Sequence, residues 1–221
     1  MKYNIEIHHR RSIRLKGYDY SQSGVYFVTV CTQNRECLLG KIDNEKMILN
    51  DAGKMVETVW NDIPRYYRGF CVHENIVMPN HFHGIIEIVV VGAGPRACPD
   101  NTGQPMENTV QPMETGQPPV NGQPQGVAPT MSLSDIVHRF KTMTTKKYID
   151  GVKQNRWTPF PRKLWQRNYY EHIIRNDNKL NRICEYIVNN PLNWDSDRNN
   201  PSRKVNDTRR ELDTEEEDCN D

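Results

Sequence analysis

Two histidines flank a phenylalanine at the start of a long apolar run, in the stretch IVMPNHFHGIIEIVVV at residues 76–91. Residues two apart in a β-strand project from the same face, about 6.6 Å apart along the backbone. His81 and His83 are therefore expected to face one side together while Phe82 points into the core. Two imidazoles that converge on one side of a rigid strand form half of a divalent-metal site. The ordinary alternative is a pair of polar side chains on a solvated face of a sheet.

A metal site needs a further ligand, and the end of the chain offers one. The zinc-hydrolase patterns His-x-His-x-Asp-His and His-Glu-x-x-His are both absent from the sequence. In EYIVNNP (residues 185–191), Tyr186 and Asn190 are four residues apart, so they are neighbours on one face of a helix. The Asn190 amide oxygen suits Mg²⁺ or Mn²⁺, and a phenol beside such a cation could attack a bound phosphodiester. Alternatively, Tyr186 is a helix-core residue and Asn190 belongs to the helix end before Pro191.

Periodicity predicts the elements that must position these side chains. Segments rich in β-branched and aromatic residues are predicted to be strands: 24–32, 70–78 and 81–91, with 35–42 as the return strand of the first and part of 157–175 extended. Apolar residues at helical spacing predict three helices: 49–67, 132–150 and 176–194. The expected helix boundaries are caps at Asn50 or Asp51 and at Ser132 or Ser134, and a stop at Pro191. Mostly antiparallel pairing of these elements predicts an α+β domain with helices packed on a sheet.

The rest of the chain differs in composition. Residues 92–130 repeat Gln-Pro units with almost no aliphatic side chains, which predicts a disordered insertion. Residues 201–221 are predicted to be an acidic disordered tail. Eight acidic and two basic residues give residues 207–221 a charge of about −6. Because the whole chain carries +1, residues 1–206 carry about +7. A single domain is therefore expected in residues 1–91 and 131–200, and its basic body favours a polyanion as partner.

Three segments, in this order, resemble the single-tyrosine HUH transposases of the insertion-sequence 200 type: MPNHFHGII, LWQRNYYEHIIRN and ICEYIVNNPLNW. The resemblance is closer to the REP-associated branch of these enzymes and covers about residues 12–91 and 131–194. HUH stands for histidine, hydrophobic residue, histidine, and the triplet at residues 81–83 fits it. The family's nucleophile then corresponds to Tyr186 and its third metal ligand to Asn190, where the broader group carries glutamine. The insertion at 92–130 departs from the compact enzymes of this family.

The resemblance implies a ferredoxin-like fold and a metal-dependent strand transfer on single-stranded hairpin DNA, with repetitive extragenic palindromes among the expected targets. Tyr186 would become linked to a 5′-phosphate and release a 3′-hydroxyl, with Mg²⁺ or Mn²⁺ held by His81, His83 and Asn190. Tyr169 and Tyr170 are alternative nucleophiles, although neither has an amide ligand four residues later. Two other functions remain open: a catalytically inactive nucleic-acid-binding domain of the same fold, and a phosphodiesterase that uses water. The resemblance leaves open whether a monomer or a homodimer forms the site.

Basic segments near aromatic residues are the expected DNA contacts. The start of the chain places a basic cluster beside Tyr18 and Tyr20, the second predicted helix carries further basic residues on its polar face, and another arginine could clamp a phosphate. These residues are Arg10, Arg11, Arg14 and Lys16, then Arg139, Lys146 and Lys147, and finally Arg175.

The chain shows no signal-peptide core and no apolar run of membrane-spanning length. Its six cysteines form no compact framework, so reduced thiols and a cytoplasmic location are expected.

Overall fold

A four-stranded antiparallel sheet lies at the centre of the computed structural model, which describes residues 15, 17–89 and 131–203. The strands lie in the order β4 (Phe70–Val77), β5 (His81–Ile88), β1 (Gly24–Cys31) and β6 (Tyr170–Ile174). Helix α1 (Asp51–Asn61) lies in the crossover from β1 to β4, and α3 (Leu133–Asn155) in the crossover from β5 to β6. This β-α-β-β-α-β arrangement is the ferredoxin-like topology, and it confirms the predicted α+β class.

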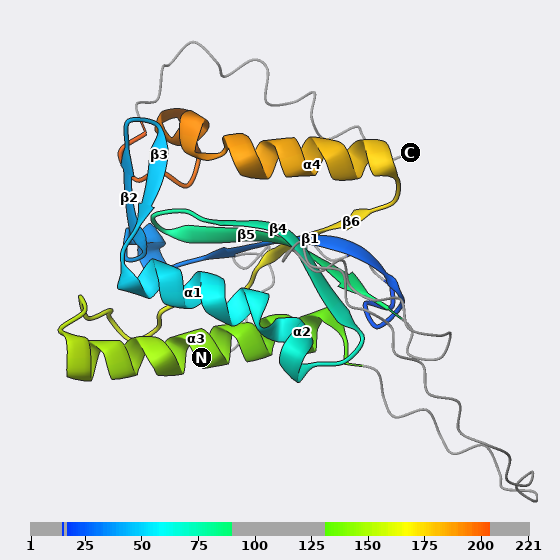
Figure 1. Cartoon of the computed structure of the whole chain (residues 1–221), viewed down its shortest axis with the longest axis horizontal. Helices are drawn as coiled ribbons and strands as arrows, with labels where there is room; N and C mark the ends of the chain where they lie inside the picture. Colours follow the sequence, from blue (N-terminus) through cyan, green and yellow to red (C-terminus); the bar gives the residue numbers. More distant parts are fainter. Residues whose placement is uncertain (1–14, 16, 90–130, 204–221) are drawn as a thin grey trace, which may run out of the picture.

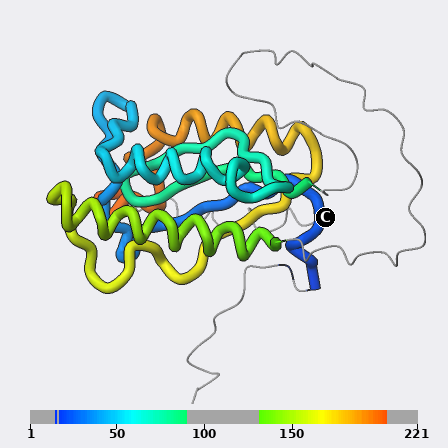
Figure 2. Tube along the Cα trace, turned by 60° about the horizontal axis from the view of Figure 1, so that its bottom comes forward, coloured from blue at the N-terminus to red at the C-terminus, as the bar shows by residue number. Residues whose placement is uncertain are grey.

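Helices cover both faces of the sheet (Figure 1). Helices α1 and α3 lie against one face and contact each other, as Figure 2 also shows, whereas α4 (Asp177–Asn189) lies on the other. The predicted caps are confirmed at Asn50 and Ser132, whose side chains accept hydrogen bonds from backbone N–H groups of the first turn. Helix α1 ends before Asp62, and a short α2 (Ile63–Tyr66) follows with a proline in its first turn. Helix α4 ends at Asn189, and Pro191 opens the 3₁₀ helix η2 (Pro191–Ser196).

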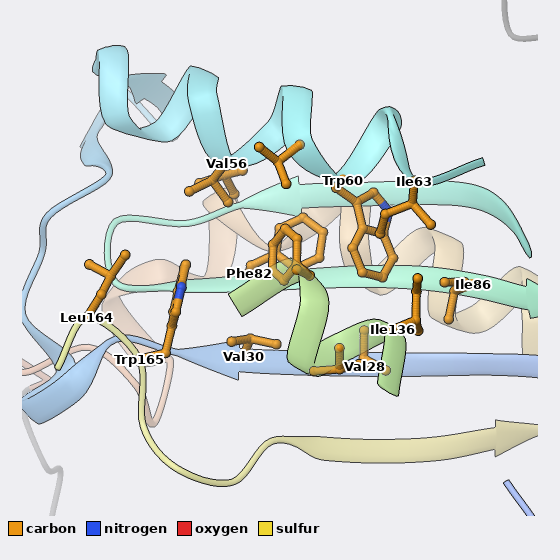
Figure 3. Packing of buried hydrophobic residues seen from close by; sticks show 14 of the residues in the cluster. Val28, Val30, Val56, Trp60, Ile63, Phe82, Ile86, Ile136, Leu164 and Trp165 are labelled. Carbon is orange, nitrogen blue, oxygen red and sulfur yellow. The ribbon is translucent and has the colours of Figure 1, made fainter. Parts of the chain in front are cut away.

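Side chains along β1 and β5 alternate between the two faces of the sheet, and this divides the core into two clusters. Val28, Val30, Phe82 and Ile86 face α1 and α3 and belong to one cluster with Trp60, and Figure 3 shows Phe82 beside the indole ring. Phe27 of β1, Ile85 of β5 and Ile174 of β6 point to the opposite face. There they form a second cluster with Ile187 of α4. Strand β5 is thus buried on both faces, which explains its nearly continuous apolar sequence.

Gly84 has a steric role in β5. A Cβ atom at this position would lie 2.7 Å from the Trp60 ring and 2.8 Å from the Phe82 ring, both of which are fully buried. The two rings pack with their centroids 4.7 Å apart. The missing side chain therefore lets the Trp60 indole approach the strand directly behind His83.

We expect Gly84→Ala to lower the free energy of unfolding by about 1–3 kcal/mol, because the methyl group overpacks a closed core. Denaturant unfolding of both proteins would measure the change. Gly24→Ala, at the open end of β1, is the matched control because its Cβ would meet only Tyr26, at 3.4 Å. Equal stability of the two variants would contradict the steric role of Gly84.

One predicted strand is wrong. Residues 35–42 do not return along β1, because both edges of β1 are occupied by β5 and β6. After β1, Asn34 and Arg35 adopt positive φ angles in the 3₁₀ helix η1 (Gln33–Arg35) and turn the chain away. Strand β2 (Gly40–Asp43) then pairs with β3 (Lys46–Leu49) as a separate two-stranded sheet.

Several predictions fall outside the described residues: the DNA contacts Arg10, Arg11, Arg14 and Lys16, the insertion at 92–130 and most of the tail at 201–221. Cys31, Cys37 and Cys184 are free, as expected, but Cys71 is disulfide-bonded, so the prediction of reduced thiols is wrong for that residue. In the part of the chain that the structure describes, every helix is too short or too polar to span a bilayer.

Candidate active site

The two histidines lie side by side at the start of β5, beneath the C-terminal half of α4. His81 and His83 share a face of the sheet as predicted, and their ring centroids are 4.6 Å apart. They do not face solvent, however: His81 is fully buried and His83 is 2% exposed, because α4 and η2 cover this face. The reading of the pair as solvated polar residues is therefore wrong.

The neighbouring Asn80 fixes the orientation and the tautomer of His81. The Asn80 amide nitrogen donates to two backbone carbonyls, of Arg35 and Asn199, so its Oδ1 is the end that faces the His81 Nδ1 at 2.9 Å. Oδ1 can only accept, and hence Nδ1 carries the ring hydrogen. The Nε2 lone pair of His81 is left facing the site, with no hydrogen-bond partner.

His83 is held by the strand on its other side. The Thr29 hydroxyl, from the opposite position on β1, lies 2.8 Å from Nδ1 of His83. Phe27 stacks on the same ring, with the two centroids 5.3 Å apart. The other ring nitrogen, Nε2, faces the hydroxyl of Tyr186 at 3.4 Å.

Tyr186, in α4, and Asn190, the residue that follows α4, both reach this pair, as the spacing of four predicted. Tyr186 is 46% exposed, so its phenol lies between the buried histidines and solvent. Burial of part of its ring raises the pKa of the phenol, which is therefore protonated at neutral pH. Asn190 is 2% exposed and lies close enough to His81 and Tyr186 to affect the pKa of both.

The donor set fits a hard divalent cation. Oδ1 of Asn190 is buried without a hydrogen-bond partner, as is Nε2 of His81, although buried polar atoms are nearly always paired. Among residues 15, 17–89 and 131–203, no three His, Cys, Asp or Glu side chains lie close enough together to hold a metal. A cation at the histidine pair would therefore need the amide oxygen of Asn190, which Mg²⁺ and Mn²⁺ accept.

Burial keeps both imidazoles neutral, the form that binds metals. Removal from water lowers the pKa of His81 from 6.5 to about 4, with the Asp197 carboxylate acting in the opposite direction. Burial, together with the neighbouring His81, also lowers the pKa of His83 well below its usual value.

We expect these shifts to make the fold less stable in acid. His81 binds a proton in the unfolded chain near pH 6.5 but in the folded chain only near pH 4, so stability is complete above pH 6.5 and falls as the pH drops toward 4. The full loss from His81 is about 3 kcal/mol. Denaturant unfolding of the wild type, His81→Asn and His138→Asn between pH 7.5 and 4 tests this.

The His81→Asn variant should lose less stability over that range than the wild type, whereas His138→Asn, on the exposed surface of α3, should match the wild type. An unchanged pH dependence in His81→Asn would show that the buried imidazole is not what acid titrates.

The alternative tyrosines differ in position. Tyr169 packs against the core on the α3 side, next to Lys141. Tyr170 is 41% exposed and lies opposite Thr29 in the sheet, hence on the same face as the histidines. Tyr186, by contrast, directly contacts His83.

The structure does not bring the predicted DNA contacts to the histidines. Arg139, Lys146 and Lys147 are exposed on α3, across the sheet from α4, and the exposed Arg175 follows the end of β6. Lys146 instead lines a groove of about 610 Å³ between α3 and residues 162–167. Six basic side chains and one acidic one line this groove: Lys141, Lys146, Lys153, Arg162, Lys163 and Arg167, with Asp150.

Sequence reasoning missed Asp197, the residue after η2. Its Oδ2 lies 3.7 Å from Nε2 of His81, and its side chain is 9% exposed. The negative charge raises the pKa of both His81 and Tyr186. No periodic pattern surrounds this residue, so nothing in the sequence pointed to it.

Comparison with known proteins identifies the family. The family model described as "Transposase IS200 like" matches residues 126–190, which include Tyr186 and Asn190 but not the histidine strand. Residues 126–190 therefore belong to an IS200-like transposase domain. This confirms the resemblance found in the sequence motifs.

A relative of this chain, an uncharacterized protein of Haemophilus influenzae, is 41% identical over 202 residues, covering 89% of this chain and 96% of the relative. Two solved structures are more distant. A REP-associated tyrosine transposase bound to a REP hairpin is 17% identical, with a TM-score of 0.46 over 83% of this chain and 73% of that one. A transposase described as putative, from Deinococcus radiodurans, is 16% identical, with a TM-score of 0.38 over 80% of this chain and 97% of that one.

Proposed function

We propose that this transposase nicks and rejoins single-stranded hairpin DNA through a covalent link to Tyr186. The observation that carries the proposal is the 3.4 Å contact between the Tyr186 hydroxyl and Nε2 of His83, beside the unpaired Nε2 of His81 and Oδ1 of Asn190. A nucleophile thus lies next to three atoms that suit a hard cation. All four side chains lie together within one chain, which supports a site that a monomer can complete.

The reaction is a transesterification. The Tyr186 oxygen attacks the phosphorus of a phosphodiester, the bond from phosphorus to the 3′ oxygen breaks, and the phenolic proton is lost as the 3′-hydroxyl is formed. The new phosphotyrosine bond resembles the bond that was broken, so a 3′-hydroxyl can reverse the step and join strands without a nucleotide cofactor.

His81, His83 and Asn190 would hold Mg²⁺ or Mn²⁺, which supplies charge stabilisation at the phosphate oxygens. The chain itself supplies rigidity: Asn80 and Thr29 fix the two imidazoles, and α4 fixes the distance between the phenol and the amide. The exposed side of Tyr186 leaves an approach for DNA from solvent.

We expect a denaturing gel to show a covalent adduct when the protein is incubated with labelled single-stranded hairpin DNA and Mn²⁺. The adduct should vanish in Tyr186→Phe, which lacks the nucleophile, and fall at least about a hundredfold in His81→Ala, because loss of electrostatic stabilisation typically costs that much. Tyr170→Phe is the matched control and should form the adduct normally.

Each failure points to another reading. An adduct that survives Tyr186→Phe and is lost in Tyr170→Phe would move the nucleophile to the sheet edge. Cleavage without any adduct in the wild type would favour water as the nucleophile. Binding of hairpins without cleavage would favour an inactive nucleic-acid-binding domain.

The groove beside α3 is a second surface that supports a DNA partner. Its basic side chains are suited to phosphates, whose neutralisation releases counterions. Lys141 itself is engaged with the backbone carbonyls of Gln166 and Asn168, so the exposed Lys146 and Arg162 are the better phosphate ligands.

We expect Lys146→Glu combined with Arg162→Glu to weaken hairpin DNA binding about tenfold or more at moderate salt. The slope of log Kd against log salt concentration should fall by about two. Fluorescence anisotropy at several salt concentrations would measure both quantities. Lys54→Glu, an exposed charge reversal on α1 outside the groove, should change neither. Equal losses in the two proteins would mean that general charge, not the groove, governs binding.

A further inference from the structure

The charged residues of helix α4 are segregated by sign around its axis. Lys179 and Arg182 precede Tyr186 by seven and four residues, so helical spacing places both cations on the side of the phenol. Since successive residues are about 100° apart around a helix, the acidic Asp177 and Glu185 lie about 180° and 100° from Tyr186. The side of α4 that carries the nucleophile is therefore its basic side.

This basic side of α4 lies toward the edge strand β6. Cys184, on the opposite side of the helix, donates from Sγ to the Glu74 carboxylate of β4 at 3.5 Å. Strands β4 and β6 are the two edges of the sheet, so the side away from β4 is the one near β6. Burial lowers the pKa of His172 of β6, and the positive charge of Lys179 lowers it further, which agrees with this placement.

The two cations line an open hollow that leads toward the phenol. The hollow has a volume of about 380 Å³ and lies beside residues 176–183, with Lys179, Arg182 and Ile183 among its lining. Both basic side chains are exposed, and within the described part of the chain neither forms an ion pair. They lie about 10 Å and 6 Å from Tyr186 along the helix axis. Both charges are therefore available to phosphates close to the nucleophile.

A third cation, Arg198, lies past the other end of α4, after η2 (Figure 1). Its backbone is held in place, because Nη1 of Arg35 donates to the Arg198 carbonyl and Nδ2 of Asn80 to that of Asn199, both at 2.7 Å. The side chain of Arg198 is exposed. Burial raises the pKa of the Tyr186 phenol, and the positive charge of Arg198 acts in the opposite direction, so this charge lies near the phenol.

We propose that a single strand of DNA lies along the basic side of α4, with the phosphate to be cleaved at Tyr186. Neighbouring phosphates contact Lys179 and Arg182 on one side of it and Arg198 on the other. The inference rests on the proposed function and deepens it, because it assigns the path of the reacting strand. The basic groove beside α3 lies across the sheet from α4 and takes another part of the same DNA.

The test compares two labelled DNAs by fluorescence anisotropy: a hairpin with single-stranded extensions at both ends, and the same hairpin without them. EDTA is present, so that binding is measured without metal-dependent cleavage. We expect Lys179→Glu combined with Arg182→Glu to weaken binding of the extended hairpin at least about tenfold. The slope of log Kd against log salt concentration should fall by about 1.4, because each phosphate contact on a single strand contributes about 0.7.

The hairpin without extensions serves as the folding control, since the same variant should bind it within about twofold of the wild type. Lys54→Glu combined with Arg65→Glu is the matched variant: it reverses two exposed charges in α1 and α2 and should leave the affinity for both DNAs within about twofold. Arg198→Gln should weaken binding of the extended hairpin only.

Unchanged binding of the extended hairpin in the α4 variant would overturn the proposal, as would equal losses on both DNAs. The adduct formed with Mn²⁺ by the wild type separates this failure from that of the proposed function. If the adduct forms and the α4 variant binds the extended hairpin normally, only the path of the strand is wrong. If the extended hairpin is selectively lost but the wild type forms no adduct, the path is supported and the proposed chemistry fails.

Discussion

Burial of two neutral imidazoles between a central strand and a covering helix is the constraint on which this structure depends. A histidine removed from water is costly unless its polar atoms are satisfied. In each ring, Nδ1 is satisfied by a neighbour, Asn80 for His81 and Thr29 for His83, and Nε2 is left for the site. The architecture around the pair keeps those two nitrogens pointing at one place.

Strand β5 meets this constraint by using its two faces differently. Phe82 and Gly84 face α1 and α3, where Trp60 fits against the strand because residue 84 has no side chain. Residues 81 and 83 face α4. The hydrophobic packing behind the strand thus fixes its position. His81 and His83, on the other face, are held rigidly as a result.

Much of this arrangement could be predicted because it follows from local periodicity. The two-residue repeat of a strand paired the histidines, and the spacing of four placed Tyr186 beside Asn190. Burial of the pair was not predictable, since it depends on which face α4 covers. The position of Asp197 was also beyond reach, because it is set by hydrogen bonds between residues 119 and 163 positions apart in the chain. The basic groove likewise combines two segments that are adjacent only after folding.

The direction of β5 has a further consequence. The histidines lie at its first residues, and the connection to α3, which contains residues 90–130, begins beyond its last residue, Ile88. Seven residue steps along a strand span roughly 23 Å. The longest interruption in the domain is therefore attached at the end of β5 that is remote from the reacting groups. Any change in the length of that connection therefore starts at the end of β5 opposite His81 and His83.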